Sequence, residues 1–154
     1  MDAITMLKAD HDKVKDLLSR LEWTTERGIK TRQELFATIK GELTVHEVIE
    51  EEIFYPALKE HPKAKELVLE GYEEHHVVDT VMAELERLDV ADETWGAKAT
   101  VMKENVEHHI EEEEREMFKQ ARQVFGRQEL EDLGTRMAKR RATAQQELGV
   151  PASR

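Results

Sequence analysis

The sequence contains no cysteine. Disulfide bonds, thiolate metal ligands and thiol nucleophiles are therefore excluded. Aromatic residues make up only 5% of the chain, and there are just three prolines and seven glycines. Because 37% of the residues are charged, this composition favours a set of amphipathic helices over a sheet protein or a disordered chain.

Long apolar runs and an excess of basic residues are also missing. No segment approaches the roughly 18 apolar residues of a membrane span, and no secretory apolar region is evident, so we expect a cytoplasmic protein without a membrane partner. The formal net charge of −11 argues against nucleic acid as a partner, because such binding needs basic patches. A length of 154 residues suits one domain with a single core.

What the chain does contain is a regular series of helix signals. They predict four long helices, at about residues 2–28, 31–56, 62–89 and 92–126, and a shorter fifth helix from Gln128. The connections are short, which favours antiparallel neighbours. We therefore expect an all-α, up-down-up-down four-helix bundle over residues 1–126, followed by a short extra C-terminal helix and tail over residues 127–154.

Particular residues define the expected helix ends. Asp2 and Asp92 are suited to cap the first and fourth helices. Thr31 and Glu34 form a T-x-x-E capping box that would open the second helix. Pro56 would end that helix, because proline cannot donate the backbone hydrogen bond that a helix interior needs.

Residues 46–50 read HEVIE and raise the question of a metalloprotease. Zinc proteases need H-E-x-x-H on a helix, and here Glu50 stands in place of the second histidine. The apolar periodicity offers another interpretation. Each of the four long helices carries one histidine at an inward position, and two helices also carry a glutamate four residues later. These six residues are His11, His46, Glu50, His75, His109 and Glu113.

The six inward residues repeat between the two halves of the chain. Along the sequence, the interval between the two single histidines is nearly the same as the interval between the two H-x-x-x-E pairs. One histidine on an apolar stripe is usually an ordinary core residue, and a run of glutamates is usually a solvated face. Six repeated inward groups are different, because burying each without a partner costs roughly 1–3 kcal/mol. A two-metal centre removes that cost, and its many imidazoles favour iron over magnesium, calcium or a tetrahedral zinc.

Four segments carry a resemblance to a known family: LKADHDKVKDLLSRL, VHEVIEEEIFYPAL, YEEHHVVDTVMAELERL and EHHIEEEEREMF. With its ligand order H, HxxxE, H, HxxxE, the chain resembles the hemerythrin-like (HHE cation-binding) proteins over roughly residues 3–122. The resemblance implies a non-haem cofactor of two iron ions joined by an oxo or hydroxo bridge. It also implies that the four histidines are terminal ligands and that the two glutamates bridge the irons, so the protease interpretation is dropped.

Two departures from the oxygen-carrying hemerythrins bear on function. Those proteins have a second histidine four residues after the third-helix ligand, where this chain has Asp79. Their fourth-helix carboxylate is an aspartate five residues after its histidine, whereas Glu113 follows His109 by four residues. Counting from His108 restores a spacing of five, so His108 is the rival ligand. We favour His109, because it continues the apolar line and matches the repeat.

The missing histidine leaves coordination positions free. About two of about twelve octahedral positions stay open, against about one in a carrier with five histidines. Asp79, Tyr72 and Tyr55 are candidates to fill one of them, with ordinary packing as the alternative role for both tyrosines.

We therefore expect turnover of a small oxidant. The candidates are hydrogen peroxide, in a catalase-like reaction, and nitric oxide, in defence against oxidative or nitrosative stress. The alternative is a module that stores or senses oxygen or iron without turnover. A third hypothesis is a structural acidic bundle that docks a partner and whose histidines are incidental. In the first two cases the ligands are small molecules, and we expect a monomer or a weak homo-oligomer.

Overall fold

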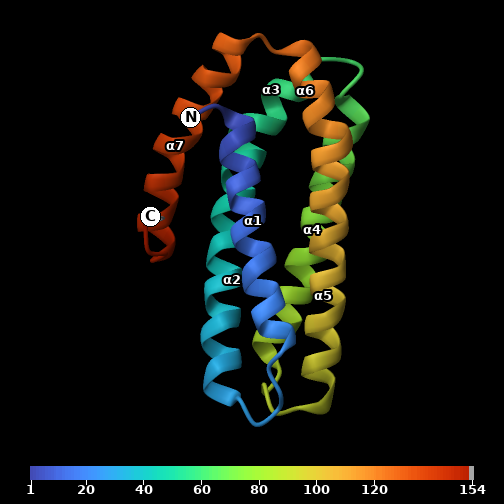
Figure 1. Ribbon diagram of the computed structural model, residues 1–154, viewed down its shortest axis with the longest axis vertical. Coiled ribbons are helices and arrows are strands. Elements are labelled where there is room, and N and C mark those ends of the chain that lie inside the picture. Colours follow the sequence, from blue (N-terminus) through green and yellow to red (C-terminus); the bar gives the residue numbers. More distant parts are fainter. Residues whose placement is uncertain (153–154) are drawn as a thin grey trace.

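Helices account for nearly all of the computed structural model, which describes residues 1–152 (Figure 1). The elements are α1 (Ala3–Glu22), α2 (Ile29–Ile49), the π-helical turn η1 (Glu50–Phe54), α3 (Tyr55–Lys59), α4 (Lys65–Arg87), α5 (Glu93–Glu112), the π-helical turn η2 (Glu113–Met117), α6 (Phe118–Val124) and α7 (Arg127–Leu148). Two runs are continuous: α2, η1 and α3 form one rod, and α5, η2 and α6 form another.

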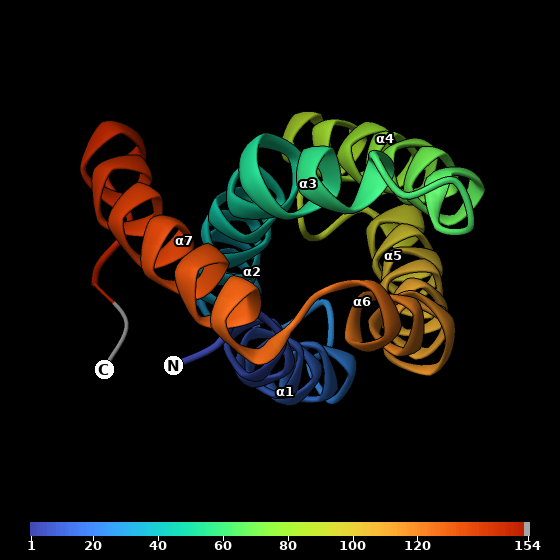
Figure 2. The ribbon, with the colours of Figure 1, turned by 90° about the horizontal axis from the view of Figure 1, so that it is seen from above.

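These two rods, together with α1 and α4, form an up-down-up-down bundle, and the expected fold class is confirmed. Viewed from above, α1, α2, α4 and α5 surround a common axis (Figure 2). Helix α7 lies outside this ring, against α1 and α2 and away from α4 and α5. In residues 1–152, no helix combines the length and apolar character that crossing a membrane requires.

The helix ends follow the sequence only in part. The side chains of Asp2 and Asp92 accept hydrogen bonds from the backbone N–H groups of Thr5 and Thr94, each at 2.8 Å, so both expected caps are confirmed. The capping box expected at residues 31–34 is wrong, because α2 begins earlier, directly after Gly28. A turn closed by the hydrogen bond from the Gly28 N–H to the carbonyl of residue 25 starts the helix before residue 31 is reached.

The expectation that Pro56 ends the second helix is also wrong. The chain stays helical to Lys59, and Pro56 lies in the first turn of α3, where a missing N–H is tolerated. Just before it, the N–H of Tyr55 bonds to the carbonyl of Glu50, five residues back, which is the wider spacing of a π turn. This wide turn accommodates the proline without breaking the rod.

The apolar core is divided into two clusters. In the orientation of Figure 1, the upper cluster lies near α3 and α6 and includes Leu7 and Phe118, and the lower cluster includes Val14 and Trp95. His11 lies between Leu7 and Val14 on α1, so a polar layer separates the clusters. The bundle therefore positions its inward histidines in a slab about halfway along its length.

Helix α7 is longer than expected, with 22 residues rather than a short segment. It begins at Arg127, where the C-terminal segment was expected to start. Gly134 lies so close to the N-terminus that a Cβ atom there would be 2.2 Å from the carbonyl oxygen of Met1. The glycine that weakens α7 as an isolated helix is thus the residue that lets it dock.

Candidate metal centre

The polar layer brings together the six residues that the repeat singles out. Between 0% and 8% of each residue is exposed: His11, His46, Glu50, His75, His109 and Glu113. Each glutamate faces imidazoles from two different helices, and the Nε2 atoms lie 3.0–3.2 Å from the facing carboxylate oxygens. The four helices of the bundle therefore direct four imidazole Nε2 atoms toward two carboxylates at one point of the core.

The outer nitrogen of each imidazole is hydrogen-bonded as well. Every Nδ1 atom lies 2.7–2.8 Å from a carboxylate oxygen, in the pairs His11–Glu114, His46–Asp10, His75–Glu51 and His109–Glu74. A carboxylate partner at Nδ1 keeps the proton there and leaves a lone pair on Nε2. All four imidazoles are thus oriented with Nε2 ready to bind a cation.

The inward positions predicted from the sequence do not include these four carboxylates. Of the glutamates next to the histidine ligands, Glu74 and Glu47 have different roles. Glu74 forms a hydrogen bond with the imidazole of His109, whereas Glu47 forms one with the carboxyl group of Asp79. A signal was present in the sequence. Each orienting carboxylate is a direct neighbour of a candidate ligand, and the four repeat between the halves of the chain just as the ligands do.

The inner atoms of the centre lack hydrogen-bond partners. Eight buried side-chain nitrogen or oxygen atoms in residues 1–152 have none, and six of them belong to the centre: Nε2 of His11, His46 and His109, both carboxylate oxygens of Glu50, and Oε1 of Glu113. Nitrogen and oxygen lone pairs face one another at about 3 Å without hydrogen-bond geometry. Acceptors arranged in this way repel one another unless a cation lies between them, so the donor set fits one or more metal ions.

Protons are the other cations that can fill this arrangement. Burial alone would lower the pKa of His75, but the adjacent carboxylates of Glu50 and Glu51 outweigh it and raise that pKa to about 9. Burial would also lower the pKa of His109, but the facing carboxylate of Glu113, together with other carboxylates, outweighs it and raises that pKa to about 10. A metal ion entering the centre must therefore displace protons from imidazoles.

Each π turn begins at one of the inner glutamates. η1 starts at Glu50 and η2 starts at Glu113. In the first, two consecutive residues reach the same imidazole, since Glu50 Oε1 lies 3.1 Å from Nε2 of His75 and Glu51 Oε2 lies 2.7 Å from its Nδ1. Glu113 and the residue after it contact His11 in the same manner. π turns are frequent at functional sites, and here they place both glutamates of each pair.

Of the two candidate tyrosines, only Tyr55 reaches the inner atoms. Its hydroxyl donates to Oε2 of Glu113 at 2.6 Å and lies 3.4 Å from Nε2 of His75. Gly71 makes room for it, because a Cβ atom there would be 2.9 Å from the tyrosine oxygen. The Tyr72 hydroxyl instead donates to the backbone carbonyl of Glu51, farther out.

The remaining two candidates point away from the inner atoms. Asp79 is exposed and forms a hydrogen bond with Glu47. The burial of Glu47, together with this hydrogen bond, raises the pKa of Glu47 to about 9. The side chain of His108 is 65% exposed, and its Nε2 lies 3.3 Å from Glu112. The structure therefore directs His109, and not its neighbour, toward the centre.

A small cavity adjoins the four imidazoles on the side of the lower cluster. Its volume is about 20 Å³, enough for a molecule the size of water or a diatomic. Apolar side chains form its far wall: Val14, Leu43, Val78, Val106 and Ile110. A ligand bound there is limited to a few heavy atoms and lies against an apolar wall.

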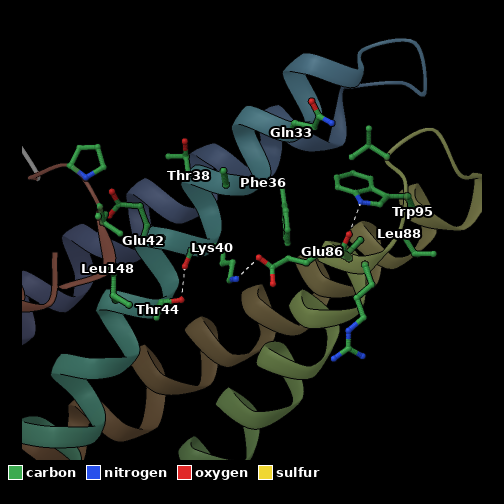
Figure 3. Close-up of a pocket in the computed structure, with 18 of the residues that line it drawn as sticks. Gln33, Phe36, Thr38, Lys40, Glu42, Thr44, Glu86, Leu88, Trp95 and Leu148 are labelled. Carbon is green, nitrogen blue, oxygen red and sulfur yellow. Dashed lines mark hydrogen bonds and ion pairs between the residues drawn. The ribbon is translucent and has the colours of Figure 1, made fainter. Parts of the chain in front are cut away.

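A much larger surface pocket lies elsewhere, with a volume of about 1190 Å³ (Figure 3). It is bounded by α2, the C-terminal end of α4 and the residues around the end of α7, and an ion pair between Lys40 and Glu86 links two of its walls. Among the described residues, its lining includes no histidine.

A helical bundle with a buried layer of imidazoles and carboxylates defines a class of cation-binding proteins. The chain belongs to the hemerythrin HHE cation-binding domain family, whose model matches residues 2–121, and the resemblance drawn from the motifs is confirmed. In agreement with this, the fold superimposes on the crystal structure of a hemerythrin HHE cation-binding domain-containing protein, a homologue of Rv2633c from Mycobacterium kansasii. The TM-score is 0.84 at 28% identity, over 96% of this chain and 89% of that one.

Two relatives in sequence differ in how much of their length is shared. The uncharacterised protein Rv2633c of Mycobacterium tuberculosis is 32% identical over 144 residues, which cover 91% of this chain and 85% of that protein. A DNA nickase of Nostoc is 23% identical over 153 residues, which cover 99% of this chain. The chain spans only 43% of the length of the nickase.

Proposed function

We propose that the centre holds two iron ions joined by an oxo or hydroxo bridge and that the protein reacts with a small oxidant. The proposed ligands are the four inner histidines and the two inner glutamates, with His109 preferred to His108. A donor set rich in imidazole and completed by carboxylates suits iron better than magnesium or calcium. The preset orientation of the four imidazoles supports the assignment, because no ring has to rotate for its Nε2 atom to bind a metal.

One observation carries the choice of substrate: the cavity of about 20 Å³ beside the imidazoles. Its size admits hydrogen peroxide, nitric oxide or dioxygen and excludes larger molecules. The position of the extra histidine of oxygen carriers is taken by Asp79, which is exposed and bonded to Glu47, so one imidazole fewer surrounds the cavity. Bound iron would supply redox chemistry toward peroxide, in a catalase-like reaction, or toward nitric oxide.

The chain's own residues have separate tasks in this proposal. The four Nδ1 hydrogen bonds hold the imidazoles in place, and the apolar cavity wall excludes bulk water. Tyr55 supplies a buried hydroxyl hydrogen bond to Glu113, and we propose it as a further ligand or donor at the centre. We assign Tyr72 and Asp79 no contact with the metal.

A second function, storage or sensing of oxygen or iron without turnover, is favoured by the burial of the centre. The six inner residues are at most 8% exposed, which suits retention of a ligand as well as its conversion. For either function we propose action in the cytoplasm as a monomer or weak homo-oligomer, with residues 1–126 as the reactive unit and 127–154 as its C-terminal segment. The net charge of −11 supports the absence of nucleic-acid and membrane partners.

The test uses protein purified without a histidine tag. Iron per chain, the visible spectrum and the consumption of added peroxide are measured on one preparation. About two irons per chain, an oxo-bridged diferric spectrum and catalytic oxygen release are the result expected of the enzyme. The same iron and spectrum without turnover would favour storage or sensing, and failure to take up iron during anaerobic reconstitution would overturn both.

A further inference from the structure

The C-terminal helix reaches the centre through a single arginine. The guanidinium of Arg141 on α7 makes two parallel hydrogen bonds to the carboxylate of Asp10 on α1, each 2.8 Å long. Oδ2 of Asp10 also accepts the hydrogen bond from Nδ1 of His46, again at 2.8 Å. A chain of two contacts thus runs from α7 to one imidazole of the centre.

This link is specific to one of the four orienting carboxylates. In residues 1–152, Asp10 is the only one of the four with a guanidinium bonded to its side chain. The arginine side chain is 16% exposed and the aspartate side chain 12%, so water competes weakly for both groups. Of the four imidazoles, His46 is therefore the one whose orientation depends on an element outside the bundle.

The planar guanidinium fixes the carboxylate more firmly than a point charge does. Two parallel hydrogen bonds define both the position and the plane of the Asp10 carboxylate, which in turn fixes the direction from which Nδ1 of His46 is held. If Arg141 were lost, Asp10 would be free to rotate, and the Nε2 lone pair of His46 would no longer be fixed toward Glu50, 3.0 Å away.

Helix α7 is docked by contacts on either side of this arginine. Leu133, Met137 and Ala144 are buried against the bundle, and Gly134 packs against the N-terminal backbone. The neighbouring Arg140 instead forms ion pairs with two exposed residues, Glu52 and Glu147. Docking of α7 and orientation of His46 consequently share one residue, Arg141.

We propose that Arg141 is a positioning residue for His46, acting through Asp10, and that it couples the docking of α7 to metal binding on the His46 side of the centre. The proposal rests on the proposed use of His46 as a metal ligand. Coupling is reciprocal: if docked α7 strengthens metal binding, then bound metal must strengthen the docking of α7 by the same factor.

The test compares Arg141→Met with its matched neighbour Arg140→Met in the full chain. Release of ferrous iron to an excess of a colorimetric chelator should be about 10-fold faster in Arg141→Met, with one of the two irons lost first, and unchanged in Arg140→Met. Arg141→Lys, which keeps the charge without the planar fork, should fall between Arg141→Met and wild type. Equal release from both methionine variants would overturn the proposal.

Two further readouts do not depend on activity. Hydrogen exchange over residues 137–148 should slow when iron binds to the wild-type protein, and this slowing should be lost in Arg141→Met. In the metal-free protein, the NMR signal of the His46 Nδ1 proton should shift in Arg141→Met and remain in place in Arg140→Met. If wild type takes up no iron, the proposed function fails, but the NMR comparison still tests the link: an unmoved His46 signal would overturn it.

Discussion

The bundle consists of two helix hairpins, α1 with the rod α2–η1–α3 and α4 with the rod α5–η2–α6, and both supply the same groups to the centre. Each contributes one single histidine, one H-x-x-x-E pair and a π turn that starts at the glutamate. Each also supplies an aromatic ring that stacks on the single histidine of the other hairpin, Tyr55 on His75 and Phe118 on His11. The repeat is therefore one of contacts as well as of sequence.

The surroundings of these groups are not repeated. Tyr55 carries a hydroxyl that bonds to Glu113, whereas Phe118, at the equivalent position of the second hairpin, has none. Both oxygens of Glu50 lack hydrogen-bond partners in residues 1–152. Helix α7 packs mainly against the first hairpin, and in the part of the chain that the structure describes it binds Asp10 but not its counterpart Glu74. A duplicated scaffold thus fixes the ligand set twice, while single residues distinguish the two sides chemically.

The largest effect should come from breaking what the hairpins share. Glu50→Ala and Glu113→Ala should each lower iron from about two ions per chain to one or none, because each carboxylate faces two imidazoles. Metal analysis of the two variants measures this, with the exposed Glu52→Ala and Glu111→Ala as controls from the same acidic runs. Full iron content in either inner variant would contradict the equivalence of the two halves.

A pH series tests the metal-free centre. His75 and His109 have folded-state pKa values of about 9 and about 10, above the unfolded value near 6.5. Their stabilising effect is therefore complete below about pH 6.5 and is lost as the pH rises through about 9 and 10. Urea unfolding of metal-free protein should show a fall of several kcal/mol over this interval.

The metal-loaded protein provides the control for this series. Bound metal replaces the protons on the imidazoles, so its stability should change less between pH 6.5 and 10. A flat profile for the metal-free protein would show that the carboxylates do not hold protonated imidazoles in the core.

Removing the hydroxyl that distinguishes the hairpins should have an intermediate effect. Tyr55→Phe leaves a buried oxygen of Glu113 without its donor and should lower the free energy of unfolding by about 1–3 kcal/mol. If Tyr55 binds iron as phenolate, the same change removes a charge-transfer band from the visible spectrum. Tyr72→Phe is the matched control and should leave the spectrum unchanged. An unaltered spectrum in Tyr55→Phe would end its role as a ligand.

The features that the sequence predicts are those encoded by periodicity and by repetition. Inward positions on each helix follow from apolar spacing, so the bundle and the convergence of His11, His46, His75 and His109 could be predicted. The π turns could not be, because a hydrogen bond from residue 55 back to residue 50 has no residue-type signature. Capping residues identified the start of α1 and α5 but not of α2, where the preceding turn outweighs the local signal at Thr31.

Contacts between distant segments were the other feature beyond prediction. Helix α7 is polar, and its docking depends on Gly134 against the N-terminal backbone and on Arg141 reaching Asp10, 131 residues away. Three of the four acidic residues that orient the imidazoles, Glu51, Glu74 and Glu114, lie within runs of glutamate, where residue type alone does not show which carboxylate faces an imidazole. That the six inner residues bind metal remains a prediction.

The smallest effect concerns two positions that are equivalent in the repeat but not in the fold. His108 corresponds to Val45, since each precedes the histidine of an H-x-x-x-E pair by one residue. Val45 is 3% exposed in the first hairpin, against which α7 mainly packs, and His108 has a 65% exposed side chain in the second hairpin.

Accordingly, His108→Ala should retain full iron and change the free energy of unfolding by less than about 0.5 kcal/mol, because the side chain only meets solvent and a surface glutamate. Val45→Ala should cost about 1–3 kcal/mol through lost burial. Chemical denaturation of both variants, with iron analysis of His108→Ala, separates the two outcomes. Loss of iron in His108→Ala would reverse the choice between the adjacent histidines and shift the ligand register of the second hairpin by one residue.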